Sequence, residues 1–229
     1  MAVLFAGGSL CFAGGAVASQ WGSSSRPAIG IAFFVGSLLF TSAAYLQYAE
    51  AASVERGLGA RVPRRRWWPA SWEPRRIDWL AALIQLVGTV LFNVSTFAAM
   101  NHALSTHQSN ARVWAPDALG SIAFLASSGL AFAEVGHQMV GARRRSLPWW
   151  IVAVNLGGSI AFGISAIASL TEPSSGEPVS ARLANAGTTW GGICFLVGAL
   201  LLMPAAAAAD EPEVATQRSG ATAGVDTAA

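Results

Sequence analysis

Six long runs of apolar residues divide the chain, and each is long enough to cross a membrane as a helix. They cover about residues 2–20, 28–50, 77–100, 116–140, 148–170 and 186–209. About 20 apolar residues, each rising 1.5 Å, span the hydrocarbon core of a bilayer. Because lipid offers no hydrogen-bond partner, such a segment must satisfy its own backbone as a helix. The pattern predicts an all-α, polytopic membrane helix bundle of six transmembrane helices over residues 1–209.

A five-residue motif recurs once in every run: glycine, a small residue, two apolar residues and phenylalanine. Its glycine–phenylalanine pairs are Gly8 and Phe12, Gly36 and Phe40, Gly88 and Phe92, Gly120 and Phe124, Gly158 and Phe162, and Gly191 and Phe195. A small residue follows each glycine at position +7, and four runs carry a polar residue at position −3. Positions −3, 0, +4 and +7 share one helix face. Helices in lipid associate through close packing and interhelical hydrogen bonds, so we interpret this face as a packing seam.

Two further regularities indicate that the repeated unit is a helical hairpin used three times. Glu50 and Glu134 each lie fourteen residues after the motif glycine of their run. Trp79 and Trp149 each precede their motif glycine by nine residues, a position that in the first run would fall before Met1. Repeats of this kind predict one structural unit stacked several times. The first helix is therefore expected either to be short or to begin upstream of Met1.

Composition agrees with a membrane location. Only 11% of residues are charged and 53% are apolar, whereas soluble domains carry about a quarter charged residues. The net charge of +2 gives no reason to expect nucleic-acid binding. Cys11 and Cys194 both lie in apolar runs and form no disulfide framework.

Arginine alternates between the connecting segments and predicts the orientation. Residues 51–76 hold seven arginines and 143–145 hold three, while the other connections have one each, Arg26, Arg112 and Arg182. Cytoplasmic loops carry the excess of basic residues, so the two arginine-rich segments are predicted to be cytoplasmic. With six spans, both termini are then also predicted to lie on the cytoplasmic side of the cytoplasmic membrane. Residues 210–229 contain little that could form a core and are predicted to be a disordered cytoplasmic tail.

The arginine-rich segments also contain tryptophan: Trp67, Trp68 and Trp72 in one, and Trp149 and Trp150 after the other. Tryptophan favours the headgroup level, and arginine there attracts anionic lipid. The expected partner is therefore the lipid bilayer, with anionic lipid at these loops. Nucleic acid is the less favoured interpretation of the same residues.

Polar residues within the runs have two interpretations. Gln85, Asn93, Asp117, Asn155 and Glu134 could line a polar path between the third, fourth and fifth runs, because ionisable groups inside a membrane are candidates for function. Alternatively they only support packing. Asp117 follows Pro116 at the expected helix start, where a carboxylate favours the helix dipole.

No residue pattern supports catalysis. His102 and His107 lack a third ligand at metal spacing, and Glu134 and His137 are spaced three residues apart as a pair that could share a proton or a metal. Glu134 beside Arg143, Arg144 and Arg145 is more simply an ion pair. We therefore expect neither enzyme activity nor a metal or cofactor.

The motifs Gly36-Ser37-Leu38-Leu39-Phe40, Gly120-Ser121-Ile122-Ala123-Phe124 and Gly158-Ser159-Ile160-Ala161-Phe162 resemble those of bacterial membrane proteins with YrhK-like domains. The lysine-free, Ala/Arg-rich composition is also similar to that of actinobacterial multi-pass proteins. The resemblance implies small hairpin units and no particular activity, and this chain departs from it by using three hairpins.

Two functions remain open from the sequence. One is a structural or interaction role in the membrane, favoured by the packing seam and the short loops. The other is a small permease or channel, whose path the polar residues would line.

Overall fold

The computed structural model describes the backbone of residues 1–53, 73–138 and 146–223, and side chains through Pro204 apart from that of Gln138. Its helices are α1 (Ala2–Trp21), α2 (Arg26–Ser53), α3 (Ile77–Ala99), α4 (Thr106–Ser109), the π-helix η1 (Asn110–Trp114), α5 (Ala115–Gln138), α6 (Leu147–Ala168) and α7 (Ala181–Ala223). Six stretches of the described chain are long and apolar enough to cross a membrane. The predicted all-α membrane helix bundle is confirmed.

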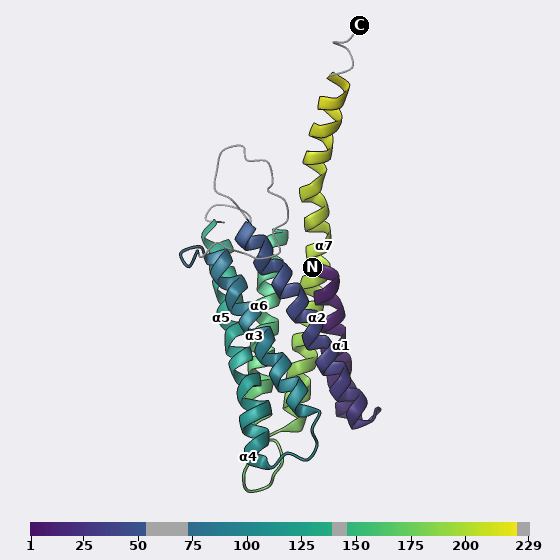
Figure 1. Cartoon of the computed structure of the whole chain (residues 1–229), viewed down its shortest axis with the longest axis vertical. Helices are drawn as coiled ribbons and strands as arrows, with labels where there is room; N and C mark the ends of the chain where they lie inside the picture. The colour runs from purple at the N-terminus through teal and green to yellow at the C-terminus, as the bar shows by residue number, and fades with distance from the viewer. Residues whose placement is uncertain (54–72, 139–145, 224–229) are drawn as a thin grey trace.

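The six long helices form a closed ring. Each packs against two neighbours in the order α1, α2, α3, α5, α6, α7, and α7 packs in turn against α1. Figure 1 shows α1 and α7 side by side, with chain connections at both ends of the bundle. Because the first and last helices meet, the ring has an interior that every helix faces.

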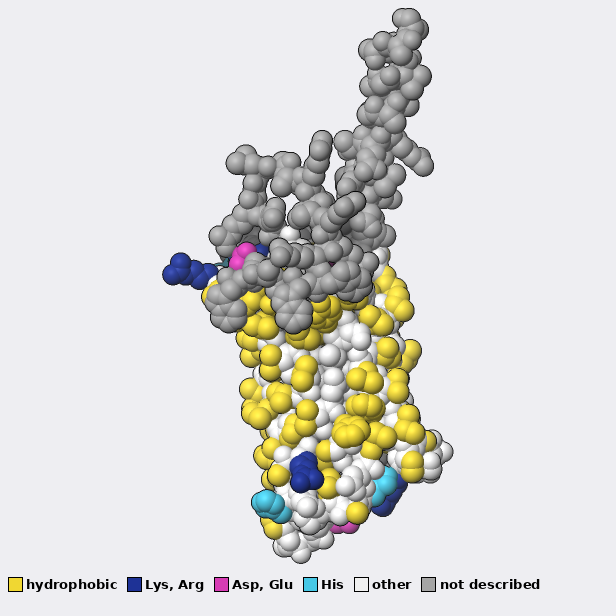
Figure 2. Space-filling view, viewed as in Figure 1, with side chains coloured by type: hydrophobic (Ala, Val, Ile, Leu, Met, Phe, Trp, Pro, Cys, Tyr) yellow, Lys and Arg dark blue, Asp and Glu magenta, His cyan; other side chains and the backbone are white. Residues whose placement is uncertain are grey.

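The outer surface of the ring is apolar. Motif position +2 is 38–60% exposed on all six helices and carries a large aliphatic residue: Leu10, Leu38, Val90, Ile122, Ile160 and Ile193. On the face seen in Figure 2, hydrophobic side chains cover the middle of the bundle, and charged side chains and histidines lie toward its two ends. The distribution is that of a surface in contact with lipid.

The fourth membrane helix begins earlier than the apolar run near residue 116 indicated. α4, η1 and α5 form one continuous helical stretch that starts at Thr106. Ser105 caps it: its hydroxyl accepts from the Gln108 backbone N–H, and the Gln108 side chain accepts from the Ser105 N–H. Asp117 therefore lies inside a continuous helix and not at its first turn.

Pro116 is accommodated in this helix by the π-helical turn before it. Proline has no N–H to donate, and its ring clashes with the carbonyl four residues earlier. In η1 the backbone widens, and the N–H of Ala115 bonds to the carbonyl of Asn110, five residues back. The wider turn lets the helix continue through a proline that the sequence suggested as its start.

The last helix is longer than its apolar run. Its apolar part spans Ala181–Pro204, and the helical backbone continues to Ala223. The run of alanine at residues 205–209 favours continuation of the helix beyond Pro204, because alanine is the best helix former. Disorder of the tail over residues 210–229 stays a prediction. The arginine-rich connections 54–72 and 139–145, where lipid binding was expected, lie outside the described residues.

Candidate functional site

Consecutive long helices pack as pairs through their motif residues. In the α3–α5 pair, a methyl group added at Gly88 would lie 2.9 Å from Cδ2 of Phe124. One added at Gly120 would lie 3.0 Å from Cε1 of Phe92. The α1–α2 and α6–α7 pairs make the same exchange of contacts, Gly8 with Phe40, Gly36 with Phe12, Gly158 with Phe195, and Gly191 with Phe162. The glycines thus set a short distance between paired helices, and a larger residue would separate them.

The six motif phenylalanines meet at the centre of the ring. They form two triangles, Phe12, Phe92 and Phe162 from α1, α3 and α6, and Phe40, Phe124 and Phe195 from α2, α5 and α7. Ring centroids are 5.8–6.4 Å apart in the first triangle and 5.6–6.2 Å apart in the second. Between the triangles, paired helices bring their two rings within 5.1–5.6 Å. All six side chains are buried, and we call them the phenylalanine plug.

A cavity lies on each side of the plug. The arginine-end cavity, of about 210 Å³, lies at the end of the bundle where Arg76 precedes α3, and Phe124 and Phe195 of the plug form part of its wall. The α4-end cavity, of about 230 Å³, is lined in part by the other triangle, Phe12, Phe92 and Phe162. Among the described residues none lines both cavities. The plug therefore separates two spaces, each large enough for several waters or one small organic molecule.

Motif positions −3 and +7 lie beside these cavities and hydrogen-bond across helix pairs. The Ser127 hydroxyl donates to the Ala81 carbonyl at 2.8 Å and to the Gln85 amide oxygen at 3.3 Å. At the other cavity, the hydroxyl oxygens of Ser165 and Thr188 lie 2.8 Å apart. These bonds join α3 to α5 and α6 to α7. Such interhelical bonds contribute about 0.6 kcal/mol each on average, so they adjust the packing without dominating it.

Where positions −3 and +7 of paired helices form no hydrogen bond, a large side chain at one position packs against a glycine at the other. A methyl group at Gly15 would lie 3.1 Å from Cε1 of Phe33. The Asn155 amide lies directly against Gly198, so that any side chain at this glycine would collide with it. A large residue at position −3 is thus accommodated by a small residue at +7 of the paired helix.

Position +1 joins neighbouring pairs. The hydroxyl oxygens of Ser37 and Thr96 lie 2.9 Å apart between α2 and α3, and the Ser121 hydroxyl donates to the Phe162 carbonyl at 3.5 Å between α5 and α6. Between α7 and α1 this position is Gly192, where a methyl group would lie only 2.9 Å from the Ala13 nitrogen. The joint that closes the ring therefore has room for glycine alone.

The structure places the five candidate path residues at four locations. Gln85 and Asn155 line the arginine-end cavity, and Asp117 lines the α4-end cavity. Asn93 lines neither cavity and instead donates from its amide to Thr41 Oγ1 at 2.9 Å, between α3 and α2. Glu134 also lines neither. Three of the five candidates therefore line two separate cavities, and the polar path itself stays a prediction.

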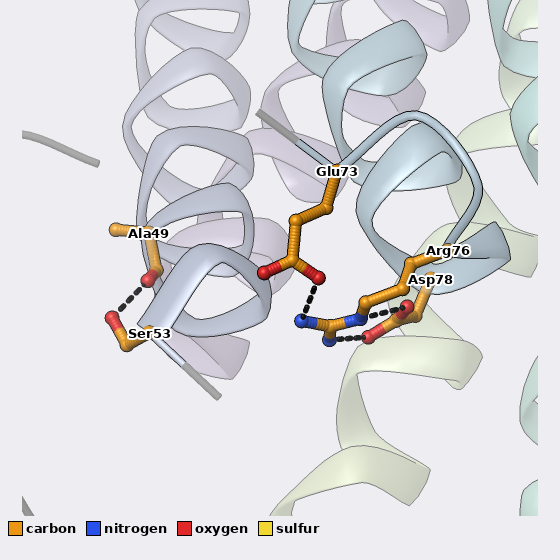
Figure 3. Close-up of polar contacts among 5 residues, drawn as sticks. All are labelled: Ala49, Ser53, Glu73, Arg76 and Asp78. Carbon is orange, nitrogen blue, oxygen red and sulfur yellow. Dashed lines mark hydrogen bonds and ion pairs between the residues drawn. The ribbon is translucent and has the colours of Figure 1, made fainter. Parts of the chain in front are cut away.

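Glu134 belongs to a charged region at the arginine end of the bundle. It lies near enough to Arg76 and Asp78 to interact with both electrostatically. Arg76 donates from Nε to Asp78 Oδ1 at 3.1 Å and from Nη1 to Glu73 Oε2 at 3.3 Å, as Figure 3 shows. Hydrogen bonding to Asp78 raises the pKa of the Arg76 guanidinium above its ordinary value. Partly exposed ion pairs of this kind add little stability, but they place charge at this end of the ring.

The α4-end cavity also contains residues that sequence reasoning did not single out. Trp114 lies in its wall, and its indole N–H donates to the Ala166 carbonyl of α6 at 2.9 Å. Asn110 exchanges two hydrogen bonds with the backbone of Thr171, which attaches η1 to the connection between α6 and α7. Both residues precede Pro116, where the apolar pattern predicts a connection and not a helix, so the pattern gives no signal for them.

No family model, no curated protein and no solved structure matches this chain. The resemblance to YrhK-like hairpin proteins and to actinobacterial membrane proteins stays a prediction. The fold defines the class: a multi-pass, all-α protein that spans a membrane.

Proposed function

We propose that this protein is a gated permease or channel for small polar solutes, and that this structure is its closed state. One observation carries the proposal: two cavities, each lined by several polar side chains among apolar ones, lie on opposite sides of the phenylalanine plug, inside a closed ring of helices. A hydrophobic constriction stops permeation because water and polar solutes do not enter it. The plug has the composition and position of such a gate.

The linings of the cavities support passage more than packing. Gln47 and Asn155 line the arginine-end cavity, and no described residue hydrogen-bonds to either side-chain amide. A polar group removed from water without a partner costs free energy. Amides that face a cavity avoid that cost if water or a solute fills the space. A bundle that serves only as a scaffold gains nothing from keeping them there.

The structural or interaction role favoured by the sequence is the alternative, since a dry bundle would need the same glycine contacts. Under our proposal the protein is not an enzyme and needs no cofactor. Because cytoplasmic loops carry the excess of arginine, we place the arginine-end cavity and both termini on the cytoplasmic side of the cytoplasmic membrane.

Solute flux into proteoliposomes tests whether the protein is a permease or channel. Phe40 contacts Phe12, Phe124 and Phe195 of the plug and is 2% exposed. Shrinking it in Phe40→Leu, and further in Phe40→Ala, is expected to widen the constriction. Stopped-flow light scattering with urea, glycerol and methylammonium should then show faster solute entry than with wild-type protein.

The matched control is Phe97→Ala, because Phe97 is 65% exposed on the outer surface and contacts Phe34 away from the plug. Truncating a buried phenylalanine costs about 3–5 kcal/mol, so Phe40→Leu serves if the alanine variant does not fold. Equal solute entry for folded Phe40→Leu, Phe97→Ala and empty liposomes would contradict the proposal and leave the structural role.

A further inference from the structure

We propose that the α4-end cavity binds a small organic cation, with the Asp117 carboxylate as its counterion. The inference deepens the proposed function and rests on it, since it names the class of solute that the conduit would admit. The cavity would be the binding site on one side of the phenylalanine plug.

The charge in this cavity is unbalanced. Asp117 is the only ionisable residue among the described residues that line it. No described residue donates a hydrogen bond to its carboxylate, although it is partly buried between helices. A carboxylate inside a membrane protein is costly unless it is paired, and such groups commonly mark ion or substrate sites. A cation from solution would supply the partner that the described residues do not.

The equivalent positions in the other helix pairs also indicate that Asp117 lacks a partner among the described residues. Asp117 occupies position −3 of its motif, and Ser95 occupies position +7 on the paired helix α3. At two equivalent places the −3 and +7 residues hydrogen-bond to each other, at 3.3 Å and 2.8 Å. Asp117 and Ser95 make no such bond, and both line the cavity. The pair that carries a charge is therefore one that no described hydrogen bond closes.

The walls of the cavity suit an organic cation. Trp114, Phe92 and Phe162 line it, and the indole of Trp114 is held by its bond to the Ala166 carbonyl. Aromatic faces attract cations within about 6 Å of the ring centroid, and tryptophan does so best. A cation held between Asp117 and these rings would exchange its hydration shell for a carboxylate and aromatic faces.

The same chemistry disfavours other ligands. Hard cations such as Ca²⁺ take 6–8 oxygen ligands, commonly with several carboxylates among them. This cavity offers one carboxylate, and its other lining residues are neutral: hydroxyl side chains, one amide, and aromatic and aliphatic residues. Anions would meet the Asp117 charge with no arginine or histidine among the described lining residues to offset it. A volume of about 230 Å³ holds a methylated or alkylated ammonium ion. The ligand class is thus a small, weakly hydrated ammonium ion.

Equilibrium binding to the full-length protein in nanodiscs tests the site independently of flux. The probe is tetramethylammonium, with tert-butanol as a neutral compound of similar shape. Calorimetry should detect tetramethylammonium binding to the wild type and weaker or no binding of tert-butanol. Asp117→Asn should weaken tetramethylammonium binding about ten- to a hundredfold, as expected for losing a charge-assisted contact. The matched control, Glu134→Gln, removes a carboxylate of the same helix outside the cavity and should bind as the wild type does.

A second measurement keeps Asp117 intact. In a background with Cys11→Ala and Cys194→Ala, tetramethylammonium should slow thiol labelling of Ser95→Cys, in the α4-end cavity. It should leave the rate at Asn155→Cys, in the other cavity, unchanged. Absence of binding to the wild type, equal binding by Asp117→Asn, or equal protection of both cysteines would each overturn the proposal. Binding of tetramethylammonium without solute flux would support this site and refute the proposed permease or channel. Solute flux without binding would refute the site and support the permease or channel.

Discussion

At the scale of single residues, position in the ring decides what a glycine contributes. Gly157 and Gly158 are adjacent in α6, yet a methyl group at Gly157 would meet nothing within 4 Å, while one at Gly158 would lie 3.1 Å from Cβ of Cys194 and from the ring of Phe195. The sequence alone does not show which of these two neighbouring glycines contacts another helix. Only the second holds α6 and α7 at their short separation.

We predict that Gly158→Leu destabilises the bundle and that Gly157→Leu does not. The larger side chain at Gly158 must displace Phe195 of the plug, and overpacking of this kind costs about 1–3 kcal/mol. Thermal unfolding of the two variants in the same detergent measures the difference. A Gly158→Leu protein with the melting temperature of Gly157→Leu would show that the close contact is not needed.

At the scale of elements, the stretch from α4 through η1 to α5 positions the α4-end cavity. The π-helical turn lets the helix pass through Pro116, and Ser109, Val113 and Trp114 come to line the cavity from the same helix as Asp117. Asn110 fastens the turn to Thr171 with bonds of 2.7 and 3.0 Å. The wall of the cavity therefore depends on contacts between two segments far apart in the chain.

We predict that Asn110→Ala loosens this end of the bundle without unfolding the rest. The variant leaves both backbone groups of Thr171 without their partner, at a cost of about 1–3 kcal/mol. Hydrogen exchange should rise in residues 169–180 and in the π turn, and remain unchanged in α1 and α2. The control is Asn101→Ala, whose side chain accepts only one exposed bond, from the Ala103 N–H at 3.1 Å. Equal exchange in the two variants would contradict the prediction.

At the scale of the whole molecule, equivalent contacts occur in all three helix pairs. Glycine and phenylalanine are exchanged within pairs, position +1 joins successive pairs, and Gly192 completes the ring between α7 and α1. These contacts are what a hairpin used three times would produce, and that repeat remains a prediction. The pairs differ at position −3, which is phenylalanine in the first and polar in the other two. Polarity in the cavities is therefore concentrated beside α3, α5, α6 and α7.

We predict that the two cavities are reached by water from opposite faces of the membrane. In a background with Cys11→Ala and Cys194→Ala, an impermeant thiol reagent should label Asn155→Cys from one face and Thr188→Cys from the other. Asn93→Cys and the outward-facing Ile160→Cys should remain unlabelled, because neither residue lines a cavity. Labelling of both cavity positions from one face would refute the separation by the plug. No labelling of either would indicate a dry bundle.

The class of structure follows from the amino-acid sequence alone. Length and apolarity of the runs predict helices in lipid, because no other conformation satisfies the backbone there. The recurrence of glycine and phenylalanine identified the residues at which helices meet, since position −3, 0, +4 and +7 share a face whatever the neighbour. Helix ends were less accurate: near Pro116, a wider turn replaced the expected helix start.

Which neighbour each helix face meets depends on how the helices are arranged in the ring. A polar residue inside an apolar run has the same local pattern whether it faces a packed helix or a cavity, so Gln85 and Asp117, at position −3, and Asn93, at position +5, were equivalent candidates. Closure of the ring separated them, because it places alternate −3 residues at opposite ends of the interior and leaves Asn93 between α2 and α3. Closure of the ring also brings six phenylalanines that are far apart in the sequence into contact at its centre. Such contacts depend on the order of helices around the ring, which periodicity along one chain does not contain.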